Sequence, residues 1–103
     1  MNKKKDDFEK WLDTQLQDDE FKKGYEKKLI QLRIAEQIIQ NRKTQNITQI
    51  ELAKRAGTSQ SAIARIEKAN YTGYSFKTLQ KVADALNCYI DIFIIPMQQR
   101  LSR

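Results

Sequence analysis

The stretch TQIELAKRAGTSQSAIARIE, from Thr48 to Glu67, restricts the fold of this chain more than any other part of it. Thr48 and Glu51 have the spacing of a capping box, in which each side chain accepts a hydrogen bond from the other residue's backbone and so starts a helix. Gly57 can take the left-handed conformation that ends this helix. Ser59 can then cap the start of a second helix. The stretch therefore predicts two short helices joined by a tight turn.

The apolar residues of this stretch fall on one side of each predicted helix. Leu52 and Ala53 from the first helix can pack against Ile63 and Ile66 from the second, which describes a helix-turn-helix. The outward side of the second helix is polar near its start, the end that enters a major groove. Amides there can pair with adenine, arginine can pair with guanine, and a hydroxyl can serve either base. We predict that base edges are read by Ser59, Gln60, Ser61 and Arg65.

Contacts to DNA phosphates are expected around the same two helices. Gln49 lies in the first turn of the first helix, where backbone donors and the helix dipole favour an anion. Basic side chains nearby would add attraction that does not depend on base sequence. The predicted phosphate contacts are Thr48, Gln49, Arg42, Lys43, Lys54, Lys68 and Lys77.

The N-terminal part is also predicted to be helical. Four apolar residues recur at helical spacing and predict a helix over about residues 6–17; they are Phe8, Trp11, Leu12 and Leu16. Asp18 or Asp19 can start a longer helix that reaches about residue 42. Gly24 is its weakest position, because glycine costs a helix about 1 kcal/mol relative to alanine.

A last helix and a strand are predicted toward the C-terminus. Ser75 can cap the helix and Asn87 can end it. Residues 88–96, CYIDIFIIP, alternate between two faces and end at a proline, which predicts a β-strand. Because one strand cannot satisfy its own backbone groups, we expect it to pair antiparallel with its copy in a homodimer. The predicted dimer contacts are Tyr89, Ile90, Asp91, Ile92, Phe93 and Ile94.

Charge is divided unevenly along the chain. Residues 6–20 contain seven acidic residues against Lys10 alone; they are Asp6, Asp7, Glu9, Asp13, Asp18, Asp19 and Glu20. From residue 21 onward there are 15 Lys and Arg against 6 acidic residues. The basic part suits phosphate, and the acidic part suits a partner of opposite charge. The alternative is that both are solvated surfaces.

Several kinds of chemistry are excluded by composition. The chain has no histidine and one cysteine, Cys88, so it can form neither an internal disulfide nor a zinc site of the Cys/His kind. It also lacks a histidine base, a glycine-rich phosphate loop and an activated thiol, so we do not expect an enzyme. No metal, cofactor or small-molecule ligand is expected. The start MNKKKDD is not followed by an apolar run, and no stretch could cross a membrane, so we expect a cytoplasmic protein.

The pattern T-Q-x-x-L-A-x-x-x-G-x-S-Q-x-x-I-x-x-x-E, from Thr48 to Glu67, resembles the Xre family of phage-repressor-type DNA-binding domains. The resemblance implies a lambda-repressor-like domain of five helices over residues 29–87 and binding to double-stranded operator DNA. With its flanks, the whole chain is predicted to be all-α, with an N-terminal helical extension and the C-terminal strand that pairs in the dimer. Its parts are the acidic arm (residues 1–28), the helix-turn-helix domain (29–87), the dimerisation strand (88–96) and a flexible tail (97–103).

The flanking segments resemble a narrower group, the HigA-type antitoxins. The resemblance is carried by F-x-x-W-L-x-x-x-L from Phe8 to Leu16, by D-D-E-F-x-x-x-Y from Asp18 to Tyr25, and by the terminal apolar strand that ends in proline. It implies an antitoxin that represses its own operon and neutralises a HigB toxin, a small basic RNase of the RelE type. The alternative is a stand-alone Xre-family repressor without a toxin partner. The predicted toxin contacts are Asp6, Asp7, Phe8, Glu9, Trp11, Leu12, Leu16 and Phe21.

Overall fold

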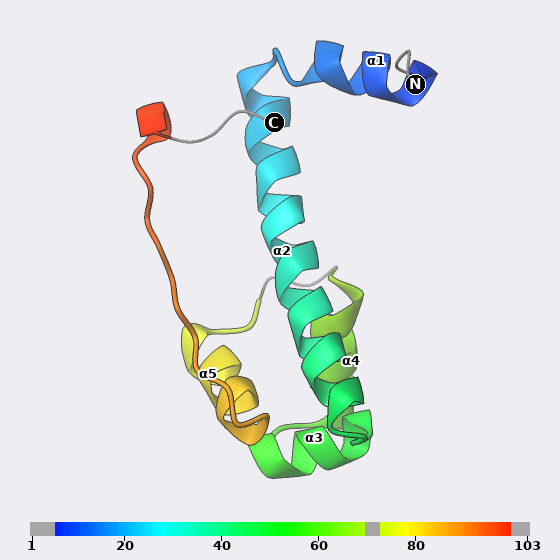
Figure 1. Cartoon of the computed structure of the whole chain (residues 1–103), viewed down its shortest axis with the longest axis vertical. Coiled ribbons are helices and arrows are strands. Elements are labelled where there is room, and N and C mark those ends of the chain that lie inside the picture. Colours follow the sequence, from blue (N-terminus) through cyan, green and yellow to red (C-terminus); the bar gives the residue numbers. More distant parts are fainter. Residues whose placement is uncertain (1–5, 70–72, 100–103) are drawn as a thin grey trace.

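The computed structural model describes residues 6–69 and 73–99, which form five α-helices and a short 3-10 turn (Figure 1). They are α1 (Asp7–Gln15), α2 (Asp19–Thr44), α3 (Gln49–Ala56), α4 (Gln60–Lys68), α5 (Phe76–Ala85) and η1 (Met97–Gln99). The C-terminal half of α2 lies with α3, α4 and α5 in one bundle, and α1 and the start of α2 project away from it (Figure 1). The prediction of an all-α domain with an N-terminal helical extension is confirmed.

The helices begin at the capping residues that the sequence predicts. Each cap accepts a hydrogen bond from a backbone N–H three residues on; the pairs are Asp18 with Phe21, Thr48 with Glu51, Ser59 with Ala62 and Ser75 with Thr78. The capping box is complete, because the Thr48 backbone N–H also donates to Glu51 Oε1 over 2.9 Å. Asp18, rather than Asp19, is therefore the residue that starts α2.

A left-handed residue follows each helix from α2 to α5, and these residues are Asn46, Gly57, Ala69 and Asn87. At Gly57, with φ of 70°, the N–H of Thr58 donates to the carbonyl of Ala53 over 2.9 Å and that of Gly57 to Lys54 over 3.2 Å. These two bonds satisfy carbonyls that the end of α3 leaves unpaired, and they reverse the chain toward α4. The predicted ends at Gly57 and Asn87 are confirmed.

The core lies between the C-terminal half of α2 and the three short helices. It contains Ile38, Ile47, Leu52, Ala53, Ala56, Ile63, Ile66, Val82 and Leu86. Leu52, Ile63 and Val82 are fully buried, each contributing about 1.5–3 kcal/mol to stability. The inward positions predicted for α3 and α4 are therefore confirmed. In α1, as the structure describes it, no residue is buried, so the core forms without the arm.

The five helices are placed differently from the prediction, which put all five within residues 29–87. The five helices include α1, so the described part of residues 29–87 contains the second half of α2 and three further helices. Helix α2 is continuous across the boundary expected between Lys28 and Leu29, and Gly24 does not interrupt it. The arm and the domain therefore share one continuous helix. No helix in the described residues is long and apolar enough to span a membrane.

The β-strand expected over residues 88–96 is not formed. This tail segment (residues 88–96) leaves the end of α5 as an extended stretch without helix or strand (Figure 1). No backbone hydrogen bond ties residues 89–94 to another described residue. A strand is defined by hydrogen bonds to a neighbouring strand, and this single chain supplies no neighbour. Of the tail expected over 97–103, residues 97–99 form η1, and the rest lies outside the described residues.

Candidate nucleic-acid interface

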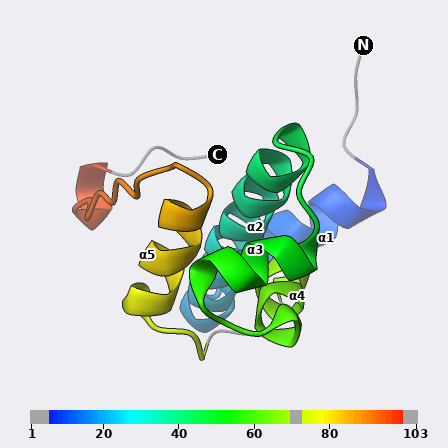
Figure 2. The same ribbon diagram turned by 90° about the horizontal axis from the view of Figure 1, so that it is seen from below.

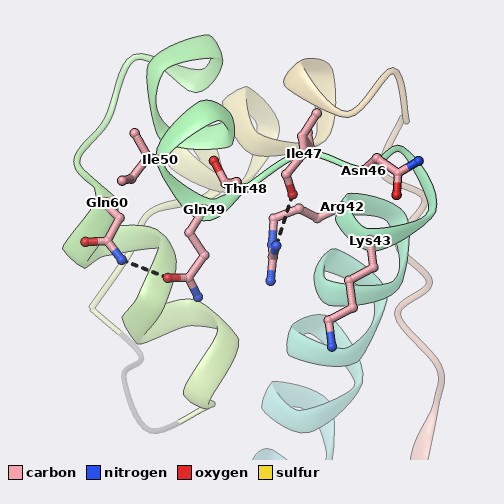
Figure 3. Close-up of a pocket in the computed structure, with 8 residues that line it drawn as sticks. All are labelled: Arg42, Lys43, Asn46, Ile47, Thr48, Gln49, Ile50 and Gln60. Carbon is pink, nitrogen blue, oxygen red and sulfur yellow. Dashed lines mark hydrogen bonds between the residues drawn. The ribbon is translucent and has the colours of Figure 1, made fainter.

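The helix-turn-helix brings the starts of α3 and α4 to the same face of the molecule. Figure 2 shows the bundle from this end, with α3 across the front and α4 and α5 on either side of it. Gln49 begins α3 and Gln60 begins α4. The Gln60 amide nitrogen Nε2 donates to Gln49 Oε1 over 2.8 Å, so the two helix starts are joined directly (Figure 3).

The two glutamines are the outer end of a hydrogen-bonded chain that reaches the interior. Gln49 Nε2 donates to Glu67 Oε1 over 2.9 Å. Glu67 in turn accepts from Arg42, whose Nε lies 2.7 Å from Oε2 and whose Nη2 lies 3.0 Å from Oε1. These hydrogen bonds therefore link Arg42 of α2 to Glu67 of α4, and Glu67 to Gln49 of α3. Gln49 is in turn bound to the first residue of α4.

Arg42 and Glu67, at the inner end of this series of hydrogen bonds, are largely shielded from solvent. The side chains of Arg42 and Glu67 are only 14% and 6% exposed, and Arg42 Nη1 also donates to the carbonyl of Ile47 over 3.0 Å. The hydrogen bond to Glu67 raises the pKa of Arg42 above its ordinary value, so the guanidinium stays charged. Each guanidinium nitrogen is engaged within the protein. Arg42, for which a phosphate contact is predicted, thus supports Glu67 and, through it, the two glutamines; the phosphate contact itself stays a prediction.

The hydrogen bonds through Glu67 and Gln49 orient the side chain of Gln60. One N–H of its amide is used by Gln49, while the other N–H and the carbonyl oxygen make no hydrogen bond to a described residue. Those two groups form a donor and an acceptor side by side. Adenine offers the complementary pair, N7 as acceptor and N6 as donor, in the major groove.

The other predicted base-reading residues lie along the same helix. Ser61 and Arg65 are exposed on α4. The Ser59 hydroxyl accepts from the Ala62 N–H over 3.1 Å and lies 3.2 Å from Ser61 Oγ, so its first role is the cap of α4. Gln60, Ser61 and Arg65 are therefore the better placed to reach a base.

A cleft of about 690 Å³ separates the end of α2 from the starts of α3 and α4 (Figure 3). Its lining residues are Arg42, Lys43, Asn46, Ile47, Thr48, Gln49, Ile50 and Gln60. Two of them, Asn46 and Ile50, were not predicted from the sequence. Ile50 is 56% exposed although it is apolar, and its position outside the inward stripe of α3 is the signal that could have identified it. Glu67 was also missed as a site residue, because its partners are distant in the sequence.

The lysines predicted to contact phosphate are not all gathered at this cleft. Lys43 lines the same cleft as Thr48 and Gln49, but on its α2 side, with Arg42 between (Figure 3). Lys54 lies near the other end of α3, in a groove that it shares with Arg55 and Lys81. Lys68 at the end of α4 and Lys77 at the start of α5 are exposed. Only Lys43 among these lysines is brought together with the two glutamines.

The acidic arm lies apart from this interface. Phe8 is 62% exposed and Trp11 50%, and Leu12, Leu16 and Phe21 are half-buried. The rings form a row, in which Trp11 lies 6.0 Å from Phe8 and 5.8 Å from Phe21, centroid to centroid. Phe21 stacks on Tyr25 at 6.2 Å. The Asp6 carboxylate accepts from the Glu9 N–H and caps α1, while Asp7 and Glu9 are exposed.

The predicted dimer residues are mostly open to solvent. Tyr89 is 86% exposed, Ile92 59%, Phe93 76% and Ile94 96%. Asp91 is also exposed, and Ile90 is half-buried.

Comparison with protein families gives one match that agrees with this geometry. A family model described as helix-turn-helix, of the Xre-like type, matches residues 38–93, which is more than half of the 103-residue chain and includes α3, α4 and α5. No curated protein and no solved structure matches the chain. The family match indicates a sequence-specific DNA-binding transcription regulator.

Proposed function

Because the chain belongs to the Xre-like helix-turn-helix family, we propose that it represses transcription by placing the start of α4 in the major groove of an operator. The observation that carries this proposal is the amide pair of Gln49 and Gln60, fixed from behind by Glu67. An amide held in one orientation loses little rotamer freedom on binding, so it discriminates between bases more sharply than a free one. Gln60, Ser61 and Arg65 are assigned to base edges.

Phosphate binding is assigned to the start of α3 and to Lys43. The first N–H groups of a helix have no acceptor within it, and the helix dipole favours an anion there. Gln49 and Ile50 occupy these positions in α3, and Lys43 lines the same cleft. A DNA strand that crosses this cleft would set the register of α4 in the groove without reading sequence.

The test compares Gln60→Ala with Lys43→Ala on a selected operator and on scrambled DNA. We expect Gln60→Ala to cost about 1–3 kcal/mol on the operator and much less on scrambled DNA. Lys43→Ala should weaken both alike and lower the dependence of log K on log salt by about 1. Fluorescence anisotropy at two salt concentrations measures both quantities. An unchanged preference for the operator in Gln60→Ala would contradict the assignment.

We further propose that the repressor is an antitoxin that neutralises a basic RNase of the HigB/RelE type. The helix-turn-helix fits a stand-alone repressor equally well, so the observation that favours this second function is the arm. Its described part combines a row of aromatic rings, of which Phe8 and Trp11 are exposed, with acidic side chains, and it contributes nothing to the core. An enzyme that binds RNA carries a basic surface, and an acidic helix is attracted to it at long range. Trp11 would then be the buried anchor.

This proposal is tested with the basic protein encoded by the neighbouring reading frame. Trp11→Ala should weaken its binding by about 10–100-fold, which is the range of an interface anchor, and should leave operator affinity unchanged. Phe76→Ala is the matched control, because Phe76 is an aromatic residue of α5 with a similar exposure of 57%. If Trp11→Ala and a chain that begins at Phe21 both neutralise the toxin as well as the full chain does, the stand-alone repressor is the better interpretation.

The active form is proposed to be a homodimer joined through the tail segment. Its support is the row of exposed apolar residues and the unpaired backbone of residues 89–94. Two copies that pair along this segment would satisfy both the backbone groups and the apolar side chains.

A further inference from the structure

The molecule exposes more surface to solvent than a compact protein of the same mass does. The chain exposes 8094 Å², whereas a compact protein of 12.1 kDa exposes about 6,000 Å². Its radius of gyration is 16.8 Å, against about 13 Å for a compact chain of this length. The excess, about 2,000 Å², is as large as the total area that a stable interface buries. The exposed apolar residues of the tail segment, above all Tyr89, Phe93 and Ile94, are part of this surface.

The length available for pairing is set at both ends. Asn87 has φ of 58°, which is outside the range of a strand, so pairing cannot extend beyond Cys88 in that direction. Pro96 lacks a backbone N–H and precedes η1, so pairing stops there. Within these limits Cys88 and Ile90 are half-buried, with Cys88 packed against the core, so the segment lies against the domain only at its start. Ile92 and Ile94, on the same side of an extended segment, are exposed.

Symmetry limits the possible registers. Two identical antiparallel neighbours are related by a two-fold axis perpendicular to their ribbon, and residues directly opposite each other share a face. One residue of each copy must therefore lie on the axis, opposite itself. The overlap within residues 88–96 is greatest when that residue is Ile92, the midpoint.

The neighbouring registers are worse for specific reasons. An axis at Asp91 would place two carboxylates directly opposite each other, which is destabilising in a strand pair. An axis at Phe93 would remove Cys88 and Tyr89 from the paired region. With the axis at Ile92, Asp91 faces the partner's Phe93, and Ile90 faces the partner's Ile94. One side of the ribbon is then lined by isoleucine.

Pro96 also fixes which residues donate across the ribbon. In an antiparallel pair, hydrogen-bonded and non-hydrogen-bonded positions alternate. Proline cannot donate, so Pro96 must occupy a non-hydrogen-bonded position, and Ile92 then does too. Tyr89, Asp91, Phe93 and Ile95 become the residues that exchange backbone hydrogen bonds with the partner.

We propose that a second copy of this chain pairs with the tail segment antiparallel, with the two-fold axis at Ile92 in a non-hydrogen-bonded position. The inference rests on the proposed homodimer and adds its register. The two copies of Ile92 then have Cα atoms about 4.5 Å apart. The two copies of Asp91, or of Phe93, lie roughly 8 Å apart, as the rise per residue and the strand spacing require.

Disulfide cross-linking tests the register. In a Cys88→Ser background, Ile92→Cys should give a covalent dimer on mild oxidation, because its Cα separation is within the range that a disulfide spans. Asp91→Cys and Phe93→Cys should remain largely uncross-linked, because their separation exceeds about 7 Å. Cross-linking of either control as complete as that of Ile92→Cys overturns the register. Sedimentation of the unmodified chain is run in parallel, and a monomer at all concentrations would overturn the dimer itself.

A charge pair provides a second test that needs no cysteine. Phe93→Lys and Phe93→Asp both remove the same ring, but the first places a cation opposite the partner's Asp91 and the second places an anion there. Each dimer contains this pair twice, so we expect the dissociation constant of the Phe93→Asp dimer to be at least about tenfold higher than that of Phe93→Lys. Equal dissociation constants would contradict the proposed pairing of these two positions.

Discussion

At the scale of single residues, Gly57 and Gly24 differ in whether the backbone conformation requires glycine. Gly57 has φ of 70° and a Cβ there would meet nothing within 4 Å, so the cost of Gly57→Ala is conformational, about 1 kcal/mol. Gly24 lies inside α2 with equally open surroundings, so Gly24→Ala should stabilise the chain by about 0.5–1 kcal/mol. Urea unfolding of each variant measures the free energy of unfolding.

The two substitutions control for each other, because each adds one methyl group at an open position. A difference of sign between them attributes the effect to backbone conformation. If both variants lost stability, the added methyl group would be making contacts that the structure does not show, and the account of Gly57 as a conformational requirement would be wrong.

At the scale of elements, the ion pair of Arg42 and Glu67 joins α2 to α4. Glu67→Ala leaves the half-buried guanidinium of Arg42 without its carboxylate partner, which should destabilise the chain by about 1–3 kcal/mol. Replacing both residues by apolar ones of similar volume, Arg42→Met with Glu67→Leu, should restore most of that stability. Urea unfolding compares the single and double variants.

The double variant also separates stability from DNA recognition. It has no carboxylate to hold Gln49, so Gln60 loses its fixed orientation even where the fold is intact. We expect it to bind scrambled DNA as well as the parent does and to discriminate for the operator less well. If the restored fold also restored full discrimination, the hydrogen-bonded chain would have no role in reading DNA.

At the scale of the whole molecule, the proposed dimer requires a two-fold symmetric operator. Its half-sites should lie one helical turn apart, about 34–36 Å between centres, or a multiple of this distance. A chain truncated after Asn87 should bind a single half-site as well as the full chain does, because the domain core is retained. It should lose about 100-fold or more in affinity for the complete operator, since the second half-site is no longer presented at high effective concentration.

Electrophoretic mobility shifts on half-site and full operators measure this difference, and the half-site serves as the control for folding. If the truncated chain bound the full operator as tightly as the complete chain does, residues 88–96 would not join the two copies.

The sequence by itself determined the features that depend on a few consecutive residues. Thr48 with Glu51, Ser59 and Ser75 start helices in the structure as their spacing predicts, and Gly57 ends α3. A cap involves a side chain and a backbone group only three residues away, so no distant contact is needed to form it. The inward positions of Leu52 and Ile63 were predictable for a similar reason, since the period of the helix alone places them on one face.

Only the tertiary structure decided how the polar residues of the site divide their roles. Arg42 and Glu67 are 25 positions apart, and Gln49 and Glu67 are 18 apart, so their contacts depend on how α2, α3 and α4 pack. From the sequence, Arg42 was one basic residue among several. Only the packing of α2 against α4 places its half-buried side chain beside Glu67. The tail segment shows the same limit, because alternation predicts which faces a strand would have, whereas the strand itself forms only when a second backbone lies beside it.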